Sequence, residues 1–123
     1  MRRFYILVFV LLATAFSRGD ASVLSNQDAA KVNAKFINVK VDNARVRVFE
    51  STLKPGDKEA LHSHPASIVY VIEGGKFRNN RADGTVTEGE LKMGDVQYRE
   101  PTTHWAENIG TNTTRLIVVE LKN

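Results

Sequence analysis

The sequence predicts an all-β fold, either a sandwich or a small barrel of short strands. Three observations support this prediction: short segments alternate between apolar and polar residues, turn-forming residues separate them at regular spacing, and no long amphipathic helix is apparent. Seven or eight such strands, without helices to cover a parallel sheet, are typical of all-β domains. The roughly 100 residues that follow the N-terminal segment are enough to enclose one such core.

The clearest strand candidates lie in the first half of the chain. Residues 36–41 and 45–50 alternate in polarity, and residues 68–72 are rich in β-branched side chains. Weaker candidates follow at residues 76–81, 85–92, 95–99, 105–108 and 115–121. Glycine, proline, asparagine and aspartate gather in the stretches between them, as expected of turns. Before the first strand, residues 22–34 predict a short helix or an arm on a neighbour.

The first 21 residues are typical of a signal peptide. Arg2 and Arg3 precede a mostly apolar run at residues 4–16, and small residues follow it as far as Ala21. This run is shorter than the roughly 20 residues that a membrane-spanning helix needs. We therefore expect cleavage after Ala21, with Ala15 as second choice, and no stable membrane span afterwards. A retained anchor and a cytosolic helix are the alternatives.

Composition excludes several classes of protein. The chain has no cysteine, which rules out disulfides, thiolate metal sites and iron–sulfur clusters. Its formal charge of +3 comes mainly from the N-terminal segment, since residues 22–123 hold 14 basic and 13 acidic side chains. A nearly neutral domain argues against a nucleic-acid binder. An exported chain without disulfides favours a bacterial periplasm over a eukaryotic secretory route, and both remain open.

The three histidines form the most informative pattern. His62 and His64 are two residues apart, so on a strand their side chains point to the same face. His104 follows a turn that contains Gly94 and Pro101, and an all-β fold can bring such distant strands together. A metal ion bridging the three is the functional interpretation. The alternative is a set of exposed or hydrogen-bonded histidines that merely line a pocket.

These histidines stand within two motifs that resemble those of the cupin superfamily. The first motif is matched by Gly56, His62-Ser63-His64-Pro65 and the run Tyr70-Val71-Ile72-Glu73-Gly74. The second is matched by Gly94-Asp95-Val96, Pro101, His104 and Asn108. The resemblance covers residues 44–121 and implies an antiparallel double-stranded β-helix, or jelly-roll, barrel. Together with the N-terminal pattern, this resemblance divides the chain into a signal peptide at 1–21, an N-terminal arm or strand at 22–43 and a cupin domain at 44–123.

The resemblance also implies a metal site, with one departure from the usual motif. His62, His64 and His104 match the metal-binding histidines, whereas Ser67 or Ile68 stands where many cupins have a ligating glutamate. Some cupins, including certain thiol and diketone dioxygenases, use three histidines without a carboxylate. We therefore expect a three-histidine site with open coordination positions. Neutral imidazoles favour Fe, Ni, Cu or Zn over Mg or Ca.

The functional prediction is an exported small cupin that binds a divalent transition metal and acts on a small organic substrate, with oxygenase chemistry favoured. No catalytic side chain or general base is identified. Tyr70, Tyr98 and Trp105 are candidates for the wall of a substrate pocket, with core packing as the default role. A non-catalytic metal-binding or small-ligand module is the alternative, and an auxiliary domain acting through its dimer interface is a third. We expect a homodimer, in which residues 36–41 cover a sheet edge.

Overall fold

The structure is a computed structural model that describes residues 27–123. The prediction of an all-β fold is confirmed, since this part of the chain holds nine strands and one four-residue helix, α1 (Ala29–Val32). No helix in it is long and apolar enough to span a membrane. The predicted signal peptide and its cleavage site lie outside the described residues.

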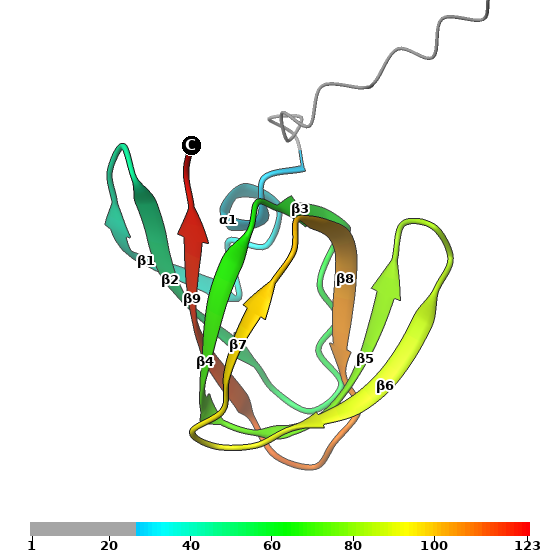
Figure 1. Ribbon diagram of the computed structural model, residues 1–123. Coiled ribbons are helices and arrows are strands. Elements are labelled where there is room, and N and C mark those ends of the chain that lie inside the picture. Colours follow the sequence, from blue (N-terminus) through cyan, green and yellow to red (C-terminus); the bar gives the residue numbers. More distant parts are fainter. Residues whose placement is uncertain (1–26) are drawn as a thin grey trace, which may run out of the picture.

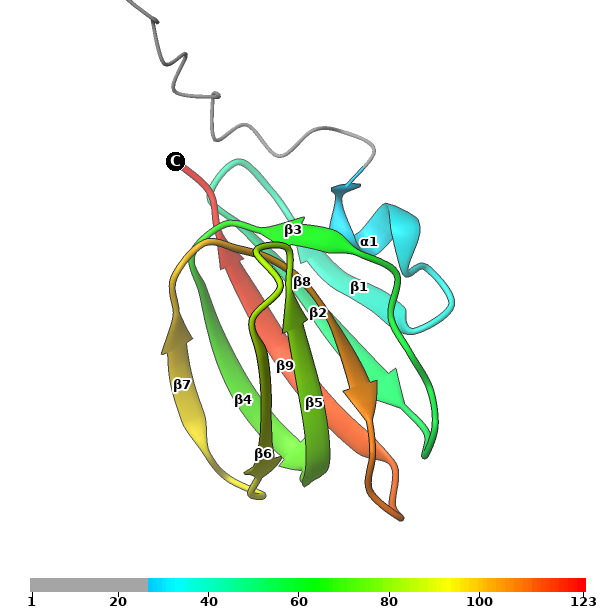
Figure 2. The ribbon, with the colours of Figure 1, turned by 90° about the vertical axis from the view of Figure 1, so that its right-hand side faces the viewer.

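The strands form two antiparallel sheets (Figure 1). The five-stranded sheet has the order β1 (Ile37–Asp42), β2 (Val46–Leu53), β9 (Thr114–Leu121), β4 (Ser67–Glu73) and β7 (Val96–Arg99). The four-stranded sheet has the order β3 (His62–His64), β8 (Thr102–Asn108), β5 (Gly75–Arg81) and β6 (Val86–Leu91). In Figure 2 the four-stranded sheet faces the viewer, and the five-stranded sheet lies behind it. The fold is a double-stranded β-helix whose two sheets are not closed into a barrel.

The core lies on the inner side of the five-stranded sheet. Phe49, Val69 and Val118 form its buried cluster, each from a different strand of that sheet. Side chains alternate along β4, so Val69 and Val71 are buried while Ile68 and Tyr70 are exposed. Both sides of β4 are therefore apolar, which explains why its sequence is a continuous apolar run instead of an alternating one.

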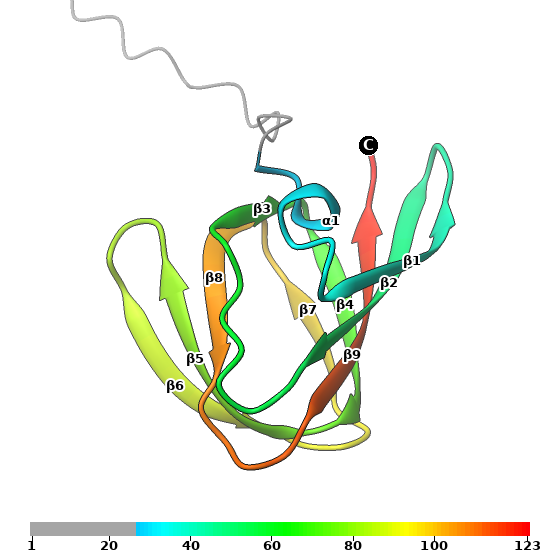
Figure 3. The ribbon, with the colours of Figure 1, turned by 180° about the vertical axis from the view of Figure 1, so that it is seen from behind.

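The N-terminal part of the described chain packs onto the same two sheets. Asp28 Oδ1 accepts a hydrogen bond from the Ala30 backbone N–H at 2.9 Å and so caps α1. The helix lies beside β3 (Figure 3), and β1 pairs with β2 along its length. Residues 36–41 thus cover the edge of β2, and β1 becomes an edge of the sheet itself.

Candidate metal centre

The three predicted histidines come together where β3 pairs with β8. His62 lies directly opposite His104 in this antiparallel pair, and His64 points to the same side as His62 because it is two residues along. Their ring centroids are 4.6 to 5.3 Å apart. One nitrogen from each ring lies within 4.8 Å of the others. The spacing predicted from the sequence is therefore realised in three dimensions.

An oxygen acceptor orients each imidazole through its Nδ1 atom. His64 Nδ1–H donates to Glu120 Oε2 at 2.7 Å, and His104 Nδ1–H donates to Asn79 Oδ1 at 2.6 Å. His62 Nδ1 lies 2.7 Å from the Ala60 carbonyl oxygen, which can only accept, and 2.9 Å from Asn33 Nδ2, which can only donate. Glu120 Oε2 and Asn79 Oδ1 keep the proton on Nδ1 of His64 and His104 and leave a lone pair on Nε2 of each of these two rings.

The three Nε2 atoms converge on one point. Those of His62 and His64 are 2.8 Å apart, and His104 Nε2 is buried with no hydrogen-bond partner in residues 27–123. A buried acceptor left unsatisfied costs about 1–3 kcal/mol. A divalent cation would satisfy all three nitrogens at once. The donor set thus fits a transition-metal ion.

Burial also keeps these ligands in the form that metals bind. It lowers the pKa of His62 to about 4, helped by the neighbouring charge of His64. It lowers the pKa of His104 to about 3, with charge on His62 and His64 as the next causes. Both imidazoles are therefore neutral at neutral pH.

Charged side chains behind His64 connect it to the N-terminal helix. Glu120 is 1% exposed and accepts from Arg47 Nε at 2.8 Å as well as from His64. Arg47 Nη2 also donates to Asp28 Oδ2 at 2.8 Å, the same residue that caps α1. In the resulting row the guanidinium of Arg47 contacts the carboxylates of both Asp28 and Glu120, and Glu120 in turn holds His64.

Asn33, at the end of α1, supports His62 in a similar way. It is 1% exposed, and its Oδ1 accepts from the Ala60 backbone N–H at 2.7 Å. Its Nδ2 donates to the Ala60 carbonyl at 3.1 Å, the same oxygen that lies 2.7 Å from His62 Nδ1. The helix thereby holds the segment that leads into β3.

Glu59, which the sequence patterns did not single out, places a carboxylate beside His62. Its Oε2 lies 3.1 Å from His62 Nε2, and its side chain is 13% exposed. Burial raises the pKa of Glu59 to about 7, against the opposing effect of Arg99. Ser67, at the expected glutamate position, is buried on the inner side of β4, whereas Ile68 is exposed on the outer side. The carboxylate comes from the loop before the histidine pair and not from the strand after it.

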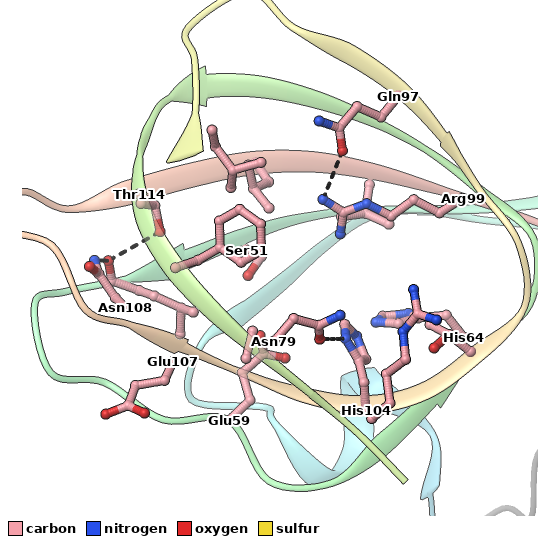
Figure 4. Close-up of a pocket in the computed structure, with 18 of the residues that line it drawn as sticks. Ser51, Glu59, His64, Asn79, Gln97, Arg99, His104, Glu107, Asn108 and Thr114 are labelled. Atoms are coloured by element: carbon pink, nitrogen blue, oxygen red, sulfur yellow. Dashed lines mark hydrogen bonds between the residues drawn. The ribbon is translucent and has the colours of Figure 1, made fainter. Parts of the chain in front are cut away.

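A cavity of about 490 Å³ adjoins the histidines between the two sheets. Figure 4 shows His64, His104 and Asn79 at one side of it and Gln97 and Arg99 at the other. Apolar residues of both sheets, including Phe49, Phe77, Leu53, Leu91, Leu116 and Val118, form much of its wall. This size and mixture of apolar wall with few polar groups are typical of small-molecule sites.

Of the three aromatic residues predicted to line a substrate pocket, only Tyr98 lies at the cavity. Tyr98 borders the cavity, although 60% of it is exposed. Tyr70 lies on the outer side of β4, and Trp105 lies next to His104 on β8; neither is among the described residues that line the cavity. The polar lining instead comes from Glu59, Asn79, Gln97 and Arg99 along with others.

Known structures resemble this fold. A cupin domain from Bordetella pertussis is 25% identical, covering 71% of this chain and 92% of its own, with a TM-score of 0.65. A Klebsiella pneumoniae protein with a double-stranded β-helix domain is 28% identical, covering 71% and 76%, with a TM-score of 0.56. A cupin from Methanocaldococcus jannaschii is 16% identical, covering 87% and 86%, with a TM-score of 0.59.

Sequence comparison alone finds no such neighbour. No protein-family model matches the chain, and no curated protein matches it. The fold assignment therefore depends on the three-dimensional arrangement and on the motifs around the histidines. This chain has the cupin fold, with three histidines close enough to one another to hold a metal ion.

Proposed function

We propose that this protein binds one divalent transition metal through His62, His64 and His104 and acts as an oxygenase on a small organic substrate in the adjoining cavity. The observation that carries the proposal is the convergence of three imidazole nitrogens, one of them buried without a partner. When bound, the metal supplies Lewis acidity and coordination positions that the three imidazoles leave open. Fe, Ni, Cu and Zn are the candidate ions.

The side chains around the proposed metal position show how the protein would hold the metal and shield a bound substrate. Glu120 and Asn79 hold the imidazoles of His64 and His104 in the tautomer that binds a metal through Nε2, and the Ala60 carbonyl and Asn33 position the ring of His62. Glu59 adds a carboxylate 3.1 Å from His62 Nε2, and histidine sets with a carboxylate are known in oxygenases that use iron. The apolar wall of the cavity would exclude water from a bound substrate.

Metal analysis followed by an oxygen-uptake screen tests this function. We expect protein purified without chelator to carry one transition-metal ion per chain and to consume oxygen in the presence of a suitable organic compound. Metal binding without oxygen consumption across a broad panel would indicate the alternative, a non-catalytic metal-binding or small-ligand module. Failure to take up Fe, Ni, Cu or Zn at all would contradict both.

We also propose that the chain is exported, to a periplasm or as a secreted protein, and loses residues 1–21. The support is the arrangement of Arg2 and Arg3, an apolar run and small residues up to Ala21. Mass spectrometry of exported protein is expected to find a mature chain that starts near Ser22. A membrane fraction that retains Met1 would instead identify an anchor.

We further propose that two copies associate through the outer side of the five-stranded sheet. On that side Val48, Val119, Ile68 and Tyr98 form an apolar and aromatic row across β2, β9, β4 and β7. The next row continues through Ile117, Tyr70 and Val96 and has Glu50 at its β2 end. We call these seven residues the outer apolar face. Arg115, at its margin, is already paired with Glu50 and Glu73. A second copy offers the same apolar surface, with the charges of Glu50 and Arg115 paired within each copy, which suits a two-fold interface.

Replacing Ile68 with Lys should weaken this dimer. Ile68 lies between Val119 and Tyr98, so the charge would be buried once in each copy of a two-fold contact. We expect the dissociation constant to rise at least tenfold, or about 1.4 kcal/mol, in light scattering coupled to size-exclusion chromatography. Val86→Lys on β6, an exposed residue of the other sheet, is the matched control. A wild-type monomer at high micromolar concentration, or an unchanged Ile68→Lys dimer, would refute the interface.

A further inference from the structure

Among the arginines of the described chain that are at least partly buried, Arg99 differs from the others because no carboxylate contacts its guanidinium. Arg47, Arg78 and Arg115 each have a carboxylate oxygen 2.6 to 2.8 Å from the guanidinium. The guanidinium of Arg99 has no carboxylate within 4.0 Å among residues 27–123, and its one side-chain hydrogen bond goes from Nη2 to Gln97 Oε1 at 3.2 Å. A charged group that lines the cavity is therefore left without a counter-ion in contact.

This arrangement is unfavourable for an arginine unless something else contacts it. Burial lowers the pKa of Arg99, while the charge of Glu59 acts in the opposite direction. An arginine nevertheless remains protonated at neutral pH, so its positive charge persists. Only one of its five N–H donors is engaged by a side chain, and removing an unpaired charge from water costs several kcal/mol.

No carboxylate that the described residues place around the cavity contacts Arg99: two of them contact other groups and the third is exposed. Glu107 lies 3.2 Å from Arg78 and 3.7 Å from Lys58, and Glu59 lies against His62 Nε2. Glu100 is on the exposed side of the chain after β7. None of them neutralises Arg99 by direct contact. A metal ion at the three neutral imidazoles would add two further positive charges to the same space.

We propose that Arg99 binds the carboxylate of a small organic anion whose apolar part packs against Phe49, Phe77 and Leu116. The guanidinium offers two parallel N–H donors that match the two oxygens of a carboxylate. Figure 4 places Arg99 and Gln97 across the cavity from His64 and His104, so a molecule held at one end by Arg99 extends toward the histidines. This inference rests on the proposed function in that the anion is the substrate of that site.

Binding of matched carboxylates and amides tests the proposal. The probes are acetate and acetamide, isovalerate and isovaleramide, and benzoate and benzamide, measured by calorimetry on metal-free and zinc-loaded protein. We expect at least one carboxylate to bind about tenfold or more tightly than its amide in both forms, because a charge-assisted bidentate pair is lost with the amide. Arg99→Gln should remove that preference, and Arg99→Lys should retain only part of it.

Arg45→Gln is the charge-matched control, because Arg45 is exposed in the turn before β2 and loses the same unit of charge. It should leave the preference for carboxylates unchanged. Metal stoichiometry measured in parallel separates the two hypotheses: failure of wild-type protein to take up zinc, iron, nickel or copper contradicts the proposed function, while the metal-free measurements still decide the role of Arg99. No preference for any carboxylate in wild-type protein, or an equal preference in Arg99→Gln, overturns the inference.

Discussion

Replacement of His104 with Ala is expected to abolish stoichiometric metal binding. His104 supplies one of three converging nitrogens from a separate strand, and its loss leaves two imidazoles that are adjacent on β3. Two ligands on one short strand hold a metal weakly against water and buffer, since structural and catalytic sites use three or four protein ligands. Metal content after dialysis, measured by mass spectrometry of the element, provides the readout. His62→Ala and His64→Ala should behave in the same way.

Asn79→Ala is the matched control for this prediction. Asn79 accepts from His104 Nδ1 at 2.6 Å and does not itself belong to the histidine cluster. Loss of such an orienting partner typically weakens metal binding about 10- to 100-fold, so this variant should still be loaded by excess zinc. Circular dichroism should find the fold of both variants intact, because the buried cluster of Phe49, Val69 and Val118 contains neither His104 nor Asn79, and its one stacking contact with the histidines is to His64. Full metal occupancy in His104→Ala would contradict the three-histidine site.

The histidine cluster was predictable because it depends on two local rules. Two-residue spacing on a strand places His62 and His64 on one side, and the second motif marks the strand that carries His104. The exact opposition of His62 and His104 depends on the register between β3 and β8, which no local pattern specifies. The family resemblance supplied that step.

The groups that complete the site were not predictable, because they reach it through tertiary structure. Glu59 stands among charged residues in a loop, where a carboxylate normally faces solvent, yet the fold buries it against His62. Glu120 and Asn79 lie 56 and 25 residues from the histidines they orient. Arg99 stands beside Glu100 and Pro101, where a charged side chain is expected to face solvent. These side chains point inward because the two sheets face each other, an arrangement that no local pattern predicts.

The side to which Tyr70 points was equally ambiguous in the sequence. Residues 68–72 are apolar throughout, so alternation does not distinguish the inner side from the outer side. In the structure the outer apolar face takes Tyr70 and Ile68, while Val69 and Val71 enter the core. The same ambiguity that left the position of Tyr70 open is the sequence signature of a strand with two apolar sides.

The free energy of unfolding of the metal-free protein should rise steeply with pH between about 4.5 and 5.5. Folding lowers the pKa of His62 from 6.5 to about 4 and that of His104 from 6.5 to about 3. In this window the unfolded state therefore holds about two more protons on these histidines. Glu59 opposes them, because folding raises its pKa from 4.5 to about 7 and the folded state keeps one more proton there. The net difference is about one proton.

This balance predicts a specific effect of Glu59→Gln. With about one proton released on folding, stability of the wild type should increase by about 1.4 kcal/mol per pH unit in the window; without Glu59 the slope should approach twice that value. Urea unfolding at closely spaced pH values in the presence of chelator measures both slopes. Glu90→Gln, on the exposed surface of β6, is the matched control and should follow the wild type. Equal slopes for Glu59→Gln and wild type would mean that Glu59 is not held in its buried place against His62.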